Sequence, residues 1–307
     1  MTVQKVPLRV SKKLDNFTNR AIGRASGHFA SYQYVRDVHV LFTSAWQTRK
    51  RSAGSRREMS VTIQCDLATA PQTIDLSAKV GDIIVDPLRP SEYTTLLIQA
   101  LYADRGAVAG AHALEIGCGS GVVLAALATL GAVQLCGVDV EPRAVGASAR
   151  LLADLGHGAV AELFQGDMWL PVAGRRFDLI VANLPHFPTK NGPVGGRLPT
   201  WSCGGPDGRE FLDEFIDGLT GYLRPGGRAL VTHNAFVGID SSRELAARHG
   251  LQLRVVVPSL VYIPADKLRT MTDSIRQEQQ GRTLHAYGPY CFGEMSIVEF
   301  RRAESHA

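Results

Sequence analysis

The sequence predicts an α/β protein built on a doubly wound, largely parallel sheet. From residue 113 onward, short apolar runs alternate with longer amphipathic segments, which is the strand–helix order that such a sheet requires. A glycine-rich segment, Leu114–Gly121, includes the first apolar run and precedes a long apolar segment. Polar residues stand at the ends of several apolar runs, where a doubly wound sheet binds its ligand. These three features together predict a ligand-binding α/β domain.

Short, mainly apolar runs bounded by glycine, proline or polar residues are predicted as strands. In chain order the seven strands are Ala113–Ile116, Leu135–Val140, Ala161–Gly166, Phe177–Ala182, Arg228–Thr232, Leu251–Pro258 and Met295–Arg301. The last strand follows a long polar segment.

Amphipathic segments predict five helices around these strands: Arg89–Leu101, Val122–Leu130, Pro142–Leu155, Gly208–Leu223 and Asp240–His249. Pro90 and Pro142 each suit a first helical turn, where the missing N–H removes no hydrogen bond. Ser91 or Glu92 is expected to cap the first helix. The run Pro225-Gly226-Gly227 is expected to end the fourth helix and to turn the chain into the next strand.

The first 80 residues follow a different pattern and predict a small, partly β extension, which precedes the domain formed by residues 81–307. Val38–Phe42 and Met59–Asp66 alternate like strands, and Ile74–Ile84 adds another short strand or two. Residues 1–60 carry twelve Lys and Arg against three acidic residues, a net charge of +9. The densest cluster, Arg49–Arg57, either steers an anionic partner such as nucleic acid or forms a solvated basic loop.

Composition places the chain among soluble globular proteins. Of its 307 residues, 45% are hydrophobic and 20% are charged. No apolar run approaches the roughly 20 residues of a membrane span, and the N-terminus lacks the apolar core of a secretory signal. Five widely spaced cysteines form no C-x-x-C pair. They are expected to be reduced thiols in a cytoplasmic protein, neither disulfides nor metal ligands.

The glycine-rich segment is the strongest functional signal. Glu115 is followed by Gly117, Gly119 and Gly121, and Asp139 ends the next apolar run. Glycines let a backbone turn tightly and approach a ligand closely, and an acid after the second strand accepts hydrogen bonds from ribose hydroxyls. A dinucleotide fingerprint would have glycine at position 122, where this chain has valine. The pattern predicts half of a nucleoside cofactor site, with a ligand-free glycine turn as the structural alternative.

The Glu-x-Gly-x-Gly-x-Gly run followed by Asp139 resembles the first motif of the class I S-adenosylmethionine (SAM) methyltransferases. The resemblance implies that SAM is the cofactor, with Glu115 and the glycine backbone holding its amino-acid end. It also implies a seven-stranded sheet whose last strand is antiparallel. After the third strand, Asp167 is expected to accept a hydrogen bond from the adenine amino group, and Met168 is expected to pack on the adenine ring.

A second resemblance begins at the end of the fourth strand, in Asn183-Leu184-Pro185-His186. This run is similar to the Asn-Pro-Pro-Tyr motif of methyltransferases that act on amide, amino and nucleobase nitrogens. Gly204–Gly208 resembles the Gly-Gly-x-Asp-Gly element of the release-factor glutamine methyltransferases, and Arg89-Pro90 is a weaker similarity. The resemblance covers residues 81–307. It implies that Asn183, at the edge of the cofactor site, and a neighbouring backbone carbonyl accept hydrogen bonds from the target NH₂ group.

Two of the four motif positions differ in this chain. Leu184 replaces the first proline and His186 replaces the tyrosine, whereas Asn183 and Pro185 keep the acceptor geometry. In the resembled motif the tyrosine stacks on the planar target. His186 either stacks in the same way or acts as a base, because its unperturbed pKa is close to neutral. A base would favour an oxygen or carbon acceptor.

Three further residues are expected to contact the substrate. Phe187 directly follows the motif, and His233 ends the fifth strand on the same rim, where a structural histidine is the equal alternative. Tyr287 belongs to the run Tyr287-Gly288-Pro289-Tyr290 in the long polar segment 262–293. This segment either closes over the substrate as a lid or is disordered, as is common for loops of this length.

These patterns predict a SAM-dependent methyltransferase whose acceptor is a small molecule or a protein side chain, with nitrogen as the expected site of methylation. A small molecule is favoured, because the first 80 residues do not resemble the all-helical recognition domain of the release-factor enzymes. An RNA base methyltransferase is the second hypothesis, supported by the basic N-terminal region. A SAM-binding partner subunit without activity is the third.

Overall fold

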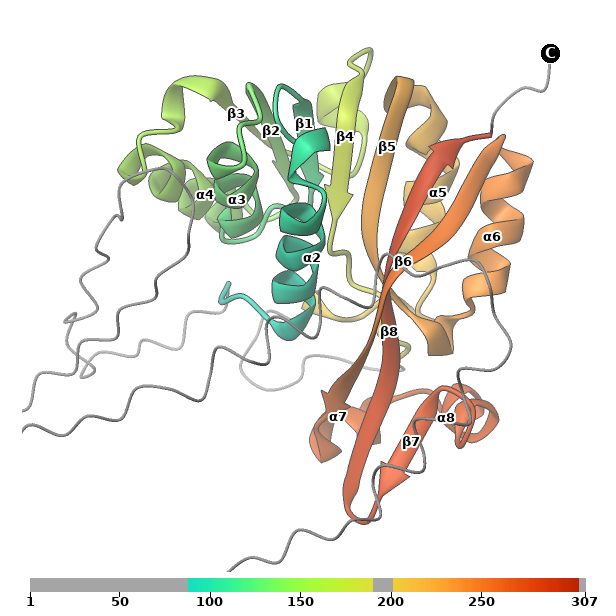
Figure 1. Cartoon of the computed structure of the whole chain (residues 1–307). Coiled ribbons are helices and arrows are strands. Elements are labelled where there is room, and N and C mark those ends of the chain that lie inside the picture. Colours follow the sequence, from blue (N-terminus) through green and yellow to red (C-terminus); the bar gives the residue numbers. More distant parts are fainter. Residues whose placement is uncertain (1–87, 190–200, 304–307) are drawn as a thin grey trace, which may run out of the picture. The chain divides into compact units, whose positions relative to one another are not determined.

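The computed structural model describes residues 88–189 and 201–303. Its strands are β1 (His112–Ile116), β2 (Gln134–Asp139), β3 (Ala161–Gln165), β4 (Phe177–Ala182), β5 (Leu223–Asn234), β6 (Leu251–Ile263), β7 (Leu284–Tyr287) and β8 (Tyr290–Arg302). They form one sheet in the order β3-β2-β1-β4-β5-β8-β6, with β7 paired to β8 (Figure 1). Strands β1 to β5 run parallel to one another, whereas β8 runs antiparallel to both β5 and β6.

The predicted doubly wound sheet with an antiparallel last strand is confirmed. Each of the seven predicted strands overlaps an observed one, and β7 is additional. Its four residues lie in the polar segment 262–293, which has no strand pattern of its own. The expected N-terminal extension, residues 1–80 with the basic cluster, lies outside the residues that the structure describes.

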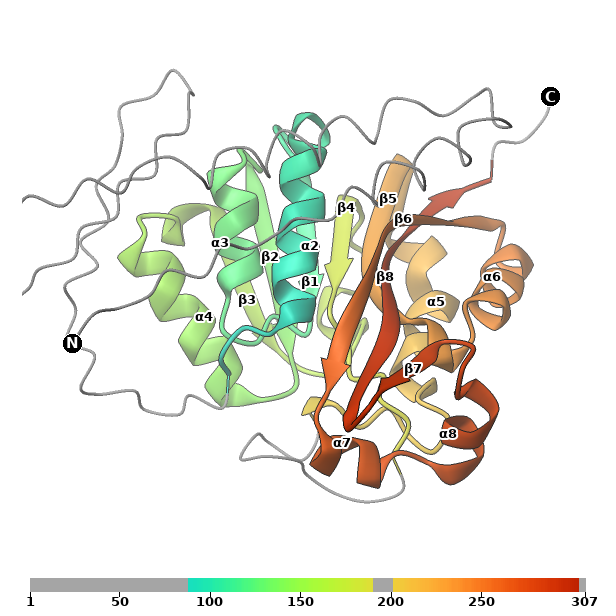
Figure 2. The same ribbon diagram turned by 60° about the horizontal axis from the view of Figure 1, so that its bottom comes forward.

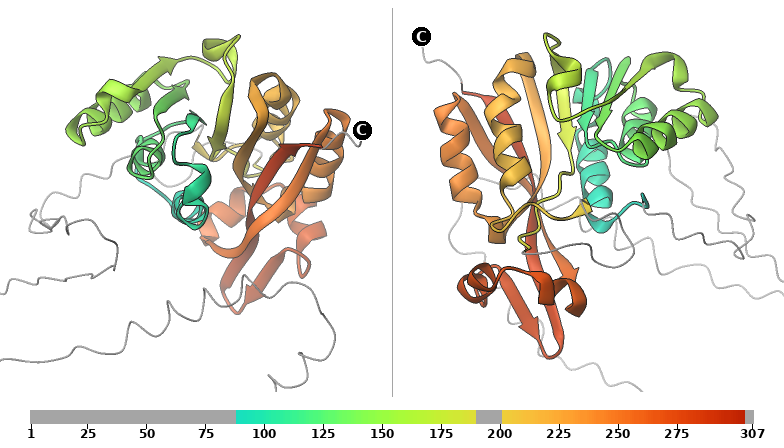
Figure 3. Two further views of the ribbon diagram at one scale, coloured as in Figure 1. Left: turned by 45° about the horizontal axis from the view of Figure 1, so that its top comes forward. Right: turned by 180° about the vertical axis from the view of Figure 1, so that it is seen from behind.

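Helices cover both faces of the sheet (Figures 1 and 3). One face carries α2 (Glu92–Ala103), α3 (Val122–Thr129) and α4 (Pro142–Asp154), and the other carries α5 (Glu210–Tyr222) and α6 (Ile239–Arg248). A separate apolar cluster fills the space between each helical layer and the sheet. None of the helices in the described ranges is both long and apolar enough to cross a bilayer.

Three predicted boundaries differ for physical reasons. Helix α2 begins at Glu92 because Ser91 and Thr94 form a capping box at its start. Helix α5 begins after Gly208, whose φ of +78° is incompatible with a helix. The residues between Leu223 and Arg228 bulge out of β5, since Phe177 pairs with Leu223 and Leu179 already pairs with Arg228.

The long strands β6 and β8 extend beyond the rest of the sheet and carry a small lobe with β7, α7 (Ala265–Thr270) and α8 (Asp273–Gln279) (Figure 2). Segment 262–293 is therefore folded, and Tyr287-Gly288-Pro289-Tyr290 is the turn between β7 and β8. One face of this lobe is buried, including Val261, Ile263 and Leu284. A side chain at position 293 would clash there, because its Cβ would lie 2.7 Å from Phe236 Cε1.

A buried ion-pair network joins β5, β6 and β8. Glu299 on β8 is 2% exposed and accepts hydrogen bonds from Arg228 (3.1 Å), Arg254 (2.9 Å) and Arg301 (2.9 Å). Arg228 also pairs with Asp104, at the end of α2. Burial opposes ionisation of Glu299, but its hydrogen bonds from the arginines outweigh burial and lower its pKa. The network thus holds an ionised carboxylate inside the sheet.

Candidate active site

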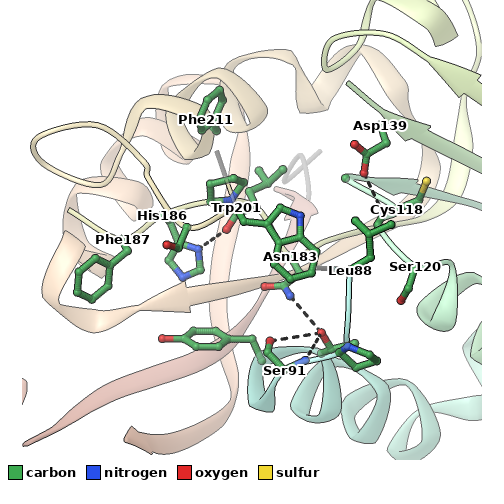
Figure 4. Close-up of a pocket in the computed structure, with 18 of the residues that line it drawn as sticks. Leu88, Ser91, Cys118, Ser120, Asp139, Asn183, His186, Phe187, Trp201 and Phe211 are labelled. Atoms are coloured by element: carbon green, nitrogen blue, oxygen red, sulfur yellow. Dashed lines mark hydrogen bonds between the residues drawn. The ribbon is translucent and has the colours of Figure 1, made fainter. Parts of the chain in front are cut away.

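A cavity of about 630 Å³ lies where β1, β2 and β4 end (Figure 4). The predicted site residues that line it are Glu115, Gly117, Gly119, Asp139, Asp167, Met168, Asn183, Pro185, His186 and Phe187. Asp139 and Cys118 lie on one side of the cavity and His186 and Phe187 on the opposite side, with Asn183 between them (Figure 4). The sheet therefore brings most of the predicted site residues to a single cavity, whereas Gly121, His233 and Tyr287 are not among the residues that line it.

The glycine loop between β1 and α3 is held by Asp139. Its Oδ2 accepts a hydrogen bond from Gly119 N (2.9 Å), and its Oδ1 accepts one from Glu141 N (2.9 Å). Each carboxylate oxygen keeps lone-pair capacity for a further donor. Burial raises the pKa of Asp139, and the two backbone hydrogen bonds counteract this rise. The side chain thus keeps acceptor capacity for a ligand in the cavity.

Gly121 allows two helices to pack closely and does not form part of the cavity wall. Its φ is +81°, and a Cβ there would lie 2.7 Å from Ser148 Cα on α4. Ser148 is fully buried, and its hydroxyl donates to Gly119 O (3.1 Å). Gly121 is not among the residues that line the cavity. It lets α3 and α4 approach each other behind the glycine loop.

Glu115 places a buried carboxyl group at the end of β1. Its side chain is 2% exposed, and its Oε2 has no hydrogen-bond partner within the described part of the chain. Burial, and then the nearby charge of Asp139, raises the pKa of Glu115 well above its ordinary value. A buried carboxyl oxygen without a partner favours a ligand that carries a hydrogen-bond donor or a positive charge. SAM carries an ammonium group and a sulfonium, so the residues present fit this cofactor.

The loop after β3 contributes Asp167 and Met168. Asp167 is exposed at the cavity, whereas Met168 is 6% exposed. Met168 has a φ of +40°, which is uncommon for a residue with a side chain. The turn thereby directs a carboxylate and an apolar side chain to the same part of the cavity.

Two threonines hold the amide group of Asn183. Thr232 Oγ1 on β5 donates to Asn183 Oδ1 (2.8 Å), and Asn183 Nδ2 donates to Thr94 Oγ1 on α2 (3.4 Å). Thr94 is fixed in turn, because its hydroxyl accepts the N–H of Ser91 (3.2 Å). The orientation of Asn183 is therefore set from two sides, and its Oδ1 retains a lone pair.

His186 is a neutral, buried ring. It is 4% exposed, and Nδ1 lies 2.5 Å from Leu184 O. Since a carbonyl only accepts, Nδ1 carries the proton. Burial lowers the pKa of His186 to about 4, so the ring is neutral near pH 7. Its Nε2 has no partner among the described residues, and the ring meets that of Tyr93 edge-on at 5.7 Å.

The Gly204–Gly208 element supports the loop that carries Asn183 and His186. Phe187 N donates to Ser202 O (2.8 Å), and Gly204 N donates to Phe187 O (3.0 Å). A Cβ at Gly204 would lie 2.7 Å from His186 Cα, and one at Gly208 would lie 2.9 Å from His186 O. The two glycines thus allow direct backbone packing between segments that are far apart in the sequence.

Two residues predicted at the substrate lie elsewhere. His233 is fully buried on the other side of β5, where Nε2 pairs with Ser242 Oγ (2.8 Å) and Nδ1 with Asn234 O (2.9 Å). Tyr287 lies at the β7–β8 turn, outside the residues that line the cavity.

The sequence did not predict Thr94, Thr232 or Tyr93 as parts of the site. Thr232 immediately precedes His233, and strand alternation directs neighbouring side chains to opposite faces. The Ser91-x-x-Thr94 spacing was a local signal for the cap. No local pattern indicated Tyr93, whose hydroxyl donates to Asn234 Oδ1 (2.7 Å) at the cavity.

We expect Asp139→Ala to lower SAM affinity by at least about tenfold. The substitution removes charge-assisted hydrogen bonds worth roughly 1.5–3 kcal/mol each, and 1.4 kcal/mol is one decade. Asp139→Asn is the matched control, because it keeps one acceptor oxygen and should lose less. Titration calorimetry with SAM gives both values. Unchanged affinity in folded Asp139→Ala protein would remove Asp139 from the cofactor site.

Glu115→Gln should stabilise the cofactor-free protein while weakening SAM binding. The variant removes a buried charge with an unpartnered oxygen, a cost of about 1–3 kcal/mol. Because the folded-state pKa of Glu115 is raised, the wild type loses stability as pH rises above the unfolded-state pKa. The advantage of the variant should therefore grow with pH. Urea midpoints across a pH series measure it, and a lower midpoint for Glu115→Gln at neutral pH would contradict the expectation.

Known proteins that resemble this chain are methyltransferases, as the residues of the cavity suggest. Residues 113–193 match a family model described as a methyltransferase domain. The chain is 33% identical over 174 residues to a provisionally named protein N5-glutamine methyltransferase of Methanocaldococcus jannaschii, covering 55% of this chain and 85% of that protein.

Two further relatives match a similar part of the chain. The release factor glutamine methyltransferase of Geobacter sulfurreducens is 35% identical over 159 residues, which are 49% of this chain and 55% of that enzyme. Methyltransferase HEMK2 of Homo sapiens is 35% identical over 151 residues, covering 46% of this chain and 69% of that protein. The chain is therefore a SAM-dependent methyltransferase of class I and belongs to the family of the glutamine methyltransferases and HEMK2.

Proposed function

We propose that this enzyme methylates the side-chain amide nitrogen of a glutamine in a protein. The names of two relatives, a protein N5-glutamine methyltransferase and a release factor glutamine methyltransferase, support this acceptor. A protein acceptor replaces the small molecule favoured by the sequence alone. That preference depended on residues 1–80, which lie outside the described part of the chain.

The observation that carries the proposal is the fixed amide of Asn183. An amide nitrogen is a weak nucleophile, so its methylation depends on a correctly oriented acceptor. Asn183 Oδ1, held by Thr232, has a lone pair for a substrate N–H. A glutamine amide supplies that N–H. When bound, SAM supplies an activated methyl group, so the residues of the chain have chiefly to align the nitrogen and exclude water.

The state of His186 supports an amide acceptor over an alcohol. Near pH 7 the ring is neutral, and its pKa of about 4 makes it a weak base. A base this weak does not deprotonate a hydroxyl, whereas a methylated amide nitrogen is a strong acid and loses its proton to water without a dedicated base. We therefore assign His186 to shaping the loop through its hydrogen bond to Leu184 O, with stacking on the planar amide. Pro185 and Phe187 complete this wall of the cavity.

The proposal is tested by methylating a whole-cell extract with isotopically labelled SAM. Protein, RNA and small-molecule fractions are then separated, and labelled protein is digested for mass spectrometry. We expect the label in protein, on glutamine side chains. Asn183→Ala serves as the inactive control, which distinguishes this enzyme from contaminants. Label in RNA or small molecules, absent with the control, would overturn the proposal in favour of the other acceptors.

A further inference from the structure

One face of the lobe formed by β6, β7 and β8 is exposed and aromatic. We call it the tyrosine face and define it by Leu260, Tyr262, Tyr287, Tyr290 and Phe292. The pairings Tyr262–Phe292 and Tyr287–Tyr290 place these side chains on the same side of the strands. The opposite side is the buried one, which packs against the core.

The tyrosine face is unusually exposed for its composition. Leu260 is 53% exposed, Tyr287 is 63% and Tyr290 is 56%. The rings touch each other, with centroid distances of 5.7 Å for Tyr262–Phe292 and 6.0 Å for Tyr287–Phe292. A solvent-facing sheet surface normally carries polar side chains. A contiguous apolar patch on such a surface is typical of an interaction site.

The tyrosine face continues into the active-site cavity. Tyr262 belongs to it and also lines the cavity, as do its neighbours Val261 and Ile263. If the glutamine side chain of a protein acceptor reaches Asn183, the residues on either side of that glutamine must lie on the surface beside the cavity. The tyrosine face begins beside the cavity at Tyr262 and extends from there along the lobe.

The charges beside the tyrosine face favour a polypeptide over a nucleic acid. Glu294 lies opposite Leu260 and His285 opposite Phe292, and these two side chains pair at 2.7 Å. Neither this pair nor the five residues of the tyrosine face include a Lys or Arg, whereas phosphate recognition requires an excess of these residues. Exposed tyrosines, with an apolar ring and a polar tip, suit protein interfaces.

We infer that the tyrosine face is the docking surface for the polypeptide that flanks the acceptor glutamine. This inference rests on the proposed function. The partner of the tyrosine face is an apolar or aromatic segment of the protein substrate, next to the acceptor glutamine. The run Tyr287-Gly288-Pro289-Tyr290, expected from the sequence to act near the substrate, serves here as an outer contact and not as part of the cavity.

The test compares two acceptors. One is a library of glutamine-centred peptides with randomised flanking residues, and the other is N-acetylglutamine methylamide, which has no flanking residues. Tyr287→Ser/Tyr290→Ser should lower kcat/KM for the peptide library by at least about tenfold, as loss of interface aromatics does. The same variant should leave SAM affinity and the rate with N-acetylglutamine methylamide unchanged. Tyr102→Ser is the matched control, since Tyr102 is an exposed tyrosine (49%) on α2 outside the cavity wall.

The outcomes separate the two proposals. Equal kcat/KM for wild type and the double variant on the library would overturn the docking surface while leaving glutamine methylation intact. If the wild type methylates neither acceptor, the proposed function fails and the docking surface fails with it. An altered oligomeric state or altered proteolysis of residues 1–80 in the variant, without a change in kcat/KM, would assign this face to a second copy or to the chain itself. Thermal unfolding checks that the variants fold.

Discussion

Replacing Asn183 by alanine should lower turnover at least about 100-fold while leaving SAM affinity nearly unchanged. Misalignment of a reacting group by about 1 Å is enough for a loss of that size. The variant removes the side chain that Thr94 and Thr232 hold in place, and the acceptor nitrogen then lacks its orienting oxygen. Steady-state kinetics with a glutamine acceptor and calorimetry with SAM measure the two quantities separately.

The threonines supply matched controls for Asn183→Ala. Thr232→Val and Thr94→Val keep side-chain volume but each removes one hydrogen bond to the Asn183 amide. Both should reduce kcat less than Asn183→Ala does, because the amide oxygen is still present but less firmly held. Full turnover in a folded Asn183→Ala protein would show that this amide does not orient the acceptor.

Glu299→Gln should lower the free energy of unfolding by about 3–5 kcal/mol, the usual cost of breaking a buried ion pair. The change leaves the guanidinium of Arg228, which is 6% exposed in its side chain, without its buried carboxylate. Arg254→Ala is the control: Arg254 is 68% exposed, and its pair with Glu299 should contribute at most about 1 kcal/mol. Urea unfolding gives the free energy of unfolding of both variants, provided that the dependence of this free energy on urea concentration is the same as in the wild type.

The stability difference should also depend on pH. The folded-state pKa of Glu299 is lowered, so its contribution is present above the unfolded-state pKa and disappears as pH falls through the folded-state pKa. Wild type and Glu299→Gln should therefore converge in acid. Equal midpoints at neutral pH would mean that the network contributes nothing to stability.

The part of the cavity lined by the glycine loop and Asp139 was predictable because its residues are close together in sequence and follow strands. Glu115, Gly119 and Asp139 line the cavity as the resemblance implied. The support around Asn183 was not predictable in the same way. Its hydrogen bonds join residues 94, 183 and 232, which meet only through the order of strands and helices. Of the neighbours Thr232 and His233, the first reaches Asn183 and the second Ser242, so strand alternation decided which of the two faces the cavity side of β5.

The lobe at the end of β6 and β8 was predictable only in part. Its sequence is polar and rich in Arg and Gln, so a long loop was the simplest interpretation. The short α7, α8 and β7 are too brief to show a clear hydrophobic period, and they depend on packing against the long strands for their stability.

The backbone packing of Gly204 and Gly208 has a consequence for how this family can change its acceptor. The loop from Asn183 to Pro188 takes its shape from main-chain hydrogen bonds and from the two glycines behind it. Side chains at positions 184 and 186 therefore do not set the path of the loop alone. A leucine and a histidine can occupy the places of a proline and a tyrosine while Asn183 stays where it is. We therefore expect substitutions at positions 184 and 186 to change the cavity wall while leaving the position of Asn183 unchanged.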